Sequence, residues 1–132
     1  MNVVVDTSVW SLALRRRSQE SPSSVEKLTR LIQDGESIFL LGIILQELLQ
    51  GLRAQKDFNR LREYLAAFPL VEPKREDYIE AARLRNRCAA KGVQAGTIDF
   101  LIAAICLRYQ CLLLTTDNDF IAIARCAPLK LL

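Results

Sequence analysis

Acidic residues beside apolar runs recur along the whole chain. They are Asp6 after a Val-Val-Val run, Glu47 before Leu-Leu, Asp99 in Thr-Ile-Asp-Phe-Leu and Asp117 in Thr-Thr-Asp-Asn-Asp-Phe. Each adjoins a segment that should be core. Because carboxylates stay hydrated unless positive charge meets them, acids held at core edges indicate a shared site for a divalent cation.

The sequence contains no histidine, which excludes a histidine general base, a histidine-activated nucleophile and histidine metal ligands. If the acids converge, two carboxylates about 4 Å apart repel by roughly 4 kcal/mol at an effective dielectric near 20. Either some acids are protonated or a cation neutralises them. Oxygen ligands without histidine or thiolate favour Mg²⁺ or Mn²⁺, and such an ion acidifies a bound water and offsets charge on a phosphate.

Each acid also has a simpler interpretation. Capping of the helices that follow could account for Asp6, Thr7 or Ser8, and for Asp117 or Asn118. Asp99 lies in the middle of an apolar helical stripe, yet a first-turn acid is also stabilised by the helix N-terminus. Glu47 borders the apolar face of its helix, where a lone glutamate is usually solvated, although Gly51 at the next turn leaves space for a cation.

Buried-strand and amphipathic-helix patterns alternate along the chain, which predicts an α/β fold with a parallel sheet. Strands are expected at 3–5, 38–41, 70–71 and 111–114, helices at 10–14, 25–33, 42–52, 58–68, 76–90, 98–109 and 118–125, and a last apolar run at 129–132. Asp6 and Asp117 directly follow the two clearest strands. They should therefore meet at the carboxyl edge of the sheet, where α/β proteins place their functional crevice.

The composition predicts one globular domain spanning 1–132, because 51% of the 132 residues are apolar and 25% are charged. The start lacks the basic flank and long apolar run of a secretion signal, and no run reaches membrane-spanning length, so we expect a soluble cytoplasmic protein. The four cysteines lack paired C-x-x-C spacing and are expected to pack in the core.

Taken in order, the four acidic segments resemble the successive motifs of PIN-domain nucleases, and most of all the VapC-like ribonuclease toxins of toxin-antitoxin pairs. The resemblance covers essentially the whole chain and implies a three-layer α/β/α domain with a central parallel sheet and a Mg²⁺- or Mn²⁺-dependent RNase site. By position, Asp6, Glu47 and Asp99 match the three principal acids, and Asp117 matches the fourth.

Three further positions near these acids carry over from the resemblance. Asp119 falls where many relatives have another acid, so either Asp117 or Asp119 faces the metal. Thr116 matches a hydroxyl position near the site, and Ser8 stands where many members have Asn. In the implied reaction, metal-activated water hydrolyses an RNA phosphodiester, with Glu47 as a ligand or as the group that orients the water.

The net charge of +3 is modest, so attraction to RNA must come from local clusters. Arg15, Arg16 and Arg17 are candidate phosphate contacts or, equally, a solvated loop. Bulky apolar residues between Ile43 and Phe68 exceed what one sheet face covers, which indicates an interface. Trp10 could belong to that interface, although we expect it in the core. The resemblance adds a homodimer and an antitoxin whose peptide fills the groove and blocks the site.

Two rival functions remain. A phosphoacceptor receiver domain is also a small parallel α/β unit with clustered acids, but it needs adjacent acids after the first strand, and Asp6 is followed by Thr7 and Ser8. A non-catalytic PIN-fold module that binds protein or RNA is the stronger alternative. Metal binding, and its loss in Glu47→Gln, would separate a nuclease from such a module.

Overall fold

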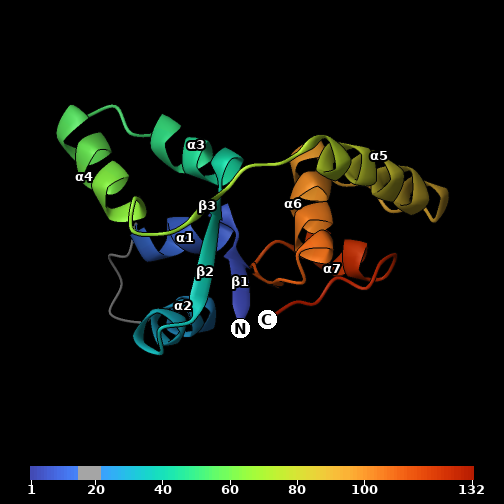
Figure 1. Cartoon of the computed structure of the whole chain (residues 1–132), viewed down its shortest axis with the longest axis horizontal. Coiled ribbons are helices and arrows are strands. Elements are labelled where there is room, and N and C mark those ends of the chain that lie inside the picture. Colours follow the sequence, from blue (N-terminus) through green and yellow to red (C-terminus); the bar gives the residue numbers. More distant parts are fainter. Residues whose placement is uncertain (15–21) are drawn as a thin grey trace.

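Four parallel strands form one sheet in the order β3-β2-β1-β4 in the computed structural model, which describes residues 1–14 and 22–132 (Figure 1). The strands are β1 Asn2–Val5, β2 Ser37–Leu41, β3 Leu70–Val71 and β4 Leu112–Leu114. The sheet is covered on both faces, and the valines of β1 are buried, which explains why their sequence shows no alternation. A parallel bridge between Leu113 and Leu131 adds the C-terminal run beside β4.

Seven helices among the described residues flank the sheet in a three-layer α/β/α arrangement. They are α1 Thr7–Leu14, α2 Ser23–Gln33, α3 Gly42–Gln50, α4 Gln55–Leu65, α5 Arg75–Ala90, α6 Thr97–Arg108 and α7 Asn118–Ala124. In Figure 1, α1 to α4 lie to the left of β1, whereas α5, α6 and α7 lie to its right. None of the helices in residues 1–14 and 22–132 has the length and apolar character needed to cross a membrane.

The largest differences from the predicted helix bounds occur in two helices. α1 begins at Thr7 rather than at Trp10, because the Asp6 carbonyl accepts hydrogen bonds from the N–H groups of Val9 and Trp10. α4 spans Gln55–Leu65 rather than 58–68. Its first turn is polar and so shows no apolar signal, and after Leu65 the chain tightens into i to i+3 bonds.

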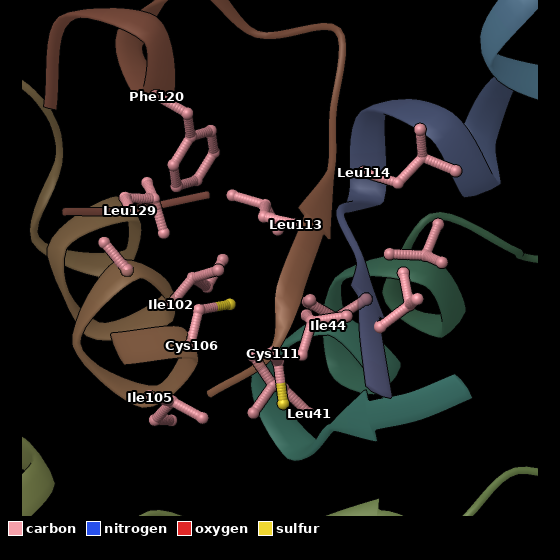
Figure 2. Close-up of a cluster of buried hydrophobic side chains, with 14 of the residues drawn as sticks. Leu41, Ile44, Ile102, Ile105, Cys106, Cys111, Leu113, Leu114, Phe120 and Leu129 are labelled. Carbon is pink, nitrogen blue, oxygen red and sulfur yellow. The ribbon is translucent and has the colours of Figure 1, made fainter. Parts of the chain in front are cut away.

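The core lies on both sides of β1 and β4. Figure 2 shows Ile102 and Cys106 of α6 facing Leu113 of β4, with Phe120 of α7 beside them. All four cysteines are buried and free, as the sequence predicted. Burial raises the pKa of Cys88 to about 11, which keeps its thiol neutral at physiological pH.

Trp10 is 1% exposed, which confirms its expected core position. Its ring makes edge-to-face contacts with Phe68 at 5.2 Å and Tyr64 at 6.5 Å between ring centroids. Both partner rings lie in the last turn of α4 or just after it, so the aromatic cluster packs α1 against the segment that leads into β3.

A buried carboxylate joins α5 to α6. Asp77 is 0% exposed, and its Oδ1 accepts a hydrogen bond from Arg108 Nη1 at 3.1 Å. Its Oδ2 accepts the Lys74 backbone N–H at 2.7 Å, which caps α5. Because α6 carries Asp99 at its other end, this bond helps to fix the helix that brings Asp99 to the sheet edge.

We expect Arg108→Leu to lower the free energy of unfolding by about 2 kcal/mol, because it leaves the Asp77 carboxylate buried without its cation. This expected change is smaller than the range for fully buried ion pairs because the Arg108 side chain is 36% exposed. Urea unfolding measures the change. Arg83→Leu removes an exposed pair with Glu80 and should change stability by less than about 0.5 kcal/mol. Equal losses in the two variants would contradict the expectation.

Candidate functional site

Strand register brings two distant segments together at the carboxyl edge of the sheet. Val5 of β1 pairs with Leu114 of β4, so the next residues, Asp6 and Thr115, leave the sheet side by side. The Asp6 N–H continues the ladder by donating to the Leu114 carbonyl at 2.9 Å. The expected meeting of the two segments at one edge is therefore present.

Two hydroxyl groups hold the same oxygen of Asp6. Ser8 Oγ donates to Asp6 Oδ2 at 2.8 Å, and Thr115 Oγ1 donates to it at 2.9 Å. Each hydroxyl oxygen also accepts a backbone N–H, from Thr116 for Ser8 and from Asp117 for Thr115. These bonds fix the orientation of the Asp6 side chain, which is only 7% exposed, and no described residue donates to its Oδ1.

Three other acids meet at this edge. Oxygen atoms of Asp99, Asp117 and Asp119 lie within 4.8 Å of one another, and Asp6 is near enough for its charge to act on Asp99. Asp99 comes from the first turn of α6, whereas the other two come from the start of α7. The described structure thus gathers acids that are 93 and more residues from Asp6 in sequence.

Local backbone bonds orient two of these acids. Asp117 caps α7, because its Oδ1 accepts the Asp119 N–H at 2.9 Å. Asp99 Oδ2 accepts the Gly96 N–H at 3.3 Å. Both acids therefore accept a backbone N–H at the start of a helix and also lie in the acid group at this edge.

Burial raises the pKa of Asp99 from 3.8 to about 6. The Gly96 N–H opposes this shift, whereas the negative charges of Asp117, Asp6 and Asp119 reinforce it. Uncompensated negative charge is what a bound cation would neutralise.

Glu47 reaches the site from α3, which begins directly after β2. Its Oε1 accepts a hydrogen bond from Thr7 Oγ1 at 3.2 Å, next to Asp6 in sequence. Glu47 does not belong to the tightest acid group among the described residues. It also lines an open groove of about 990 Å³ between α1, α3 and α4. The other lining residues are Ser11, Leu14, Leu48, Gly51, Leu52, Asp57, Arg60, Leu61 and Tyr64.

Sequence reasoning missed two hydroxyl residues of the site. It singled out Thr116, but the side chain that bonds Asp6 is that of Thr115, and Thr116 contributes its backbone N–H. Thr7 was considered only as a possible cap of the helix that follows, and its bond to Glu47 was not expected, although its place directly after Asp6 was a usable signal. Arg15, Arg16 and Arg17 lie outside the described residues.

The donor set at this edge fits a hard divalent cation. The group formed by Asp99, Asp117 and Asp119 offers carboxylate oxygens alone, and Mg²⁺ and Mn²⁺ prefer such ligands. Asp99, Asp117 and Asp119 could share one ion, with Asp6 Oδ1 as a further donor.

In the absence of metal, we expect the free energy of unfolding to fall as the pH rises, because the folded state binds the Asp99 proton more tightly than the unfolded state does. Its folded pKa of about 6 exceeds the ordinary 3.8, so the stabilisation from its bound proton is full below about pH 4 and lost as pH passes 6. Because the carboxyl is partly in water, we expect a change on the order of 1 kcal/mol. Urea unfolding at pH 4.5 and 7 in EDTA, compared with Asp99→Asn, isolates it. An identical pH dependence in both proteins would contradict this assignment.

A family model described as PIN domain matches residues 3–125 of the sequence. No curated protein matches it. Among solved structures, the chain is similar to VapBC2 from Rickettsia felis bound to a promoter DNA fragment, with a TM-score of 0.80 and 20% identity, covering 100% of this chain and 98% of that one.

Two structures from Mycobacterium tuberculosis are also similar. VapBC-5, of the VapBC family of toxin-antitoxin systems, has a TM-score of 0.69 at 22% identity, covering 99% of this chain and 97% of that one. VapC20, described as a sarcin-ricin loop cleaving toxin, has a TM-score of 0.66 at 16% identity, with 91% and 93% covered. At these identities the likeness concerns the fold.

Proposed function

Because the chain belongs to the PIN domain family, we propose that it is a Mg²⁺- or Mn²⁺-dependent endoribonuclease and the toxin of a toxin-antitoxin pair. The observation that carries the proposal is the meeting of Asp6, Asp99, Asp117 and Asp119 at one sheet edge. The fold likeness to VapBC-5 and VapC20 supports this proposal, since one is described as a member of a family of toxin-antitoxin systems and the other as a sarcin-ricin loop cleaving toxin.

The acids have two kinds of role in the proposed reaction. Asp6, Asp99 and Asp117 hold the cation directly or through water, and Asp119 lies close enough to share that task. A bound divalent ion supplies an acidified water and positive charge at the scissile phosphate. Glu47 either joins the ligands or orients the attacking water, since its carboxylate faces Thr7 beside Asp6.

The hydroxyl groups of Ser8 and Thr115 fix the orientation of the Asp6 carboxylate. Their donation to Oδ2 leaves Oδ1 for the cation. Ser8 can therefore replace the Asn that many family members carry at this position, because its hydroxyl also donates a hydrogen bond there.

The proposed protein partner is a cognate antitoxin that occupies the groove between α1, α3 and α4. Leucine side chains and Tyr64 line much of this groove, and its charged residues are Glu47, Asp57 and Arg60, which leave a net negative charge. A peptide with apolar side chains and one cation would match both properties. We further propose that the protein acts in the cytoplasm. We also propose that it forms a homodimer, and light scattering of the purified protein tests this oligomeric state.

Cleavage of cellular RNA tests the proposed activity. Purified protein is incubated with total RNA in Mg²⁺, in Mn²⁺ and in EDTA, and the new ends are mapped. We expect discrete cleavage with either ion and none in EDTA. Glu47→Gln should lose most of the activity, whereas Glu63→Gln, a solvent-exposed glutamate on α4, should keep it.

The opposite result would support a different function. Protein that binds neither ion, and whose properties do not change in Glu47→Gln, would be a non-catalytic binding module of the PIN fold. Titration with Mn²⁺, followed by its electron paramagnetic resonance signal, gives this answer without any RNA.

A further inference from the structure

The hydrogen bond from Thr7 to Glu47 joins two helices that are distant in sequence. Thr7 Oγ1 donates to Glu47 Oε1 at 3.2 Å across 40 residues, from the first residue of α1 to the second half of α3. Both side chains are partly buried. The start of α1 does not depend on this hydroxyl, because the N–H groups of Val9 and Trp10 donate to the Asp6 carbonyl.

Glu47 needs such a restraint more than the other acids do. Asp6 is short and held by two hydroxyls, and Asp99 and Asp117 accept backbone N–H groups. A glutamate has one more rotatable bond, and Glu47 stands at the wall of an open groove. Among the described residues, Thr7 is the one that donates a hydrogen bond to its carboxylate.

The bond also divides the two oxygens of the carboxylate. Oε1 is taken by the Thr7 hydroxyl, and no described residue donates to Oε2. Asp6 shows the same division, with Oδ2 held by hydroxyls and Oδ1 left over. In both acids, one oxygen anchors the side chain and the other is available to a ligand.

We propose that Thr7 is a positioning residue that holds the Glu47 carboxylate at the acid cluster, with Oε1 anchored and Oε2 presented to the metal or its water. This inference rests on the proposed function. It gives Thr7, directly after the first acid, a role that helix formation does not explain.

Thr7→Val and Thr7→Ser test the hydroxyl, because valine keeps the shape and loses the donor whereas serine keeps the donor. We expect Thr7→Val to weaken Mn²⁺ binding about tenfold and to lower kcat about tenfold, because each change is on the scale of one hydrogen bond to a charged group. The KM for RNA should stay within about twofold of the wild-type value. Thr7→Ser should restore both to within about threefold of wild type.

A double-mutant cycle ties the effect to Glu47. In the Glu47→Gln background, Thr7→Val should change Mn²⁺ affinity by less than about twofold, because the charged acceptor is already gone. Metal-free thermal unfolding of the same four proteins should show coupling between the two positions. Thr29→Val is the matched control, since it removes a helix hydroxyl that bonds the Val25 carbonyl away from the site.

Each outcome decides something. Wild-type Mn²⁺ affinity in Thr7→Val, or equal losses in the valine and serine variants, would overturn the positioning role while leaving the nuclease in place. Wild-type protein that neither binds Mn²⁺ nor cuts RNA would overturn the proposed function itself. Additive effects in both cycles would show that Thr7 acts on something other than Glu47.

Discussion

Asp6→Asn is expected to lower RNA cleavage about a thousandfold while the protein stays folded. The asparagine carbonyl can still accept the hydroxyls of Ser8 and Thr115, so the contacts of Oδ2 survive. Its NH₂ group then stands in place of Oδ1 and cannot bind a cation. A loss of this size corresponds to about 4 kcal/mol of transition-state stabilisation, which is within what a metal site supplies.

Single-turnover cleavage of an RNA containing a mapped site measures this loss, and circular dichroism confirms the fold. Asp34→Asn is a suitable control, because Asp34 lies at the far end of α2, away from the acid cluster. Retention of more than about a tenth of wild-type activity would remove Asp6 from the reaction. The same loss in Asp34→Asn would point to a general defect.

Trp10→Ala is expected to destabilise the protein by about 3 to 5 kcal/mol, the usual cost of deleting a large aromatic side chain from a core. The ring is buried and contacts Tyr64 and Phe68, so its removal leaves a cavity between α1 and the end of α4. Since α1 starts with Thr7 and Ser8, loosening this helix should also weaken Mn²⁺ binding.

Urea unfolding at pH 7 gives the size of the effect. Tyr78→Ala is the matched control, because this aromatic residue is 54% exposed and its loss should cost less than about 1 kcal/mol. A Trp10→Ala protein with nearly wild-type stability would mean that the aromatic cluster contributes little to the position of α1.

Sequence patterns predicted the sheet well because β1, β2 and β4 are mostly buried, and only the short edge strand β3 is more exposed. An uninterrupted run such as Val3 to Val5 can be read without tertiary information, and each helix shows its apolar stripe. The meeting of Asp6 with the β4 segment followed from the geometry of parallel sheets alone. The bounds of α4 were wrong because a polar first turn shows no such stripe.

Other features depend on contacts that no local pattern records. The pair of Asp77 and Arg108 joins residues 31 apart, and each looks like an ordinary helix-end charge in the sequence. The choice of Thr115 over Thr116 as the hydroxyl on Asp6 depends on which side chain turns inward after β4. The sequence alone does not show which of two adjacent hydroxyl side chains faces the site.

The sequence separation of 109 between Asp6 and Thr115 also bears on the order in which the site is assembled during translation. A ribosome releases β1 first, but its neighbour β4 and the acids of α7 are among the last parts to be translated. A nascent chain shorter than this has one edge of its central strand unpaired and its acid group incomplete. Truncated translation products that end before β4 therefore lack Asp117 and Asp119, and we expect them to show none of the proposed nuclease activity.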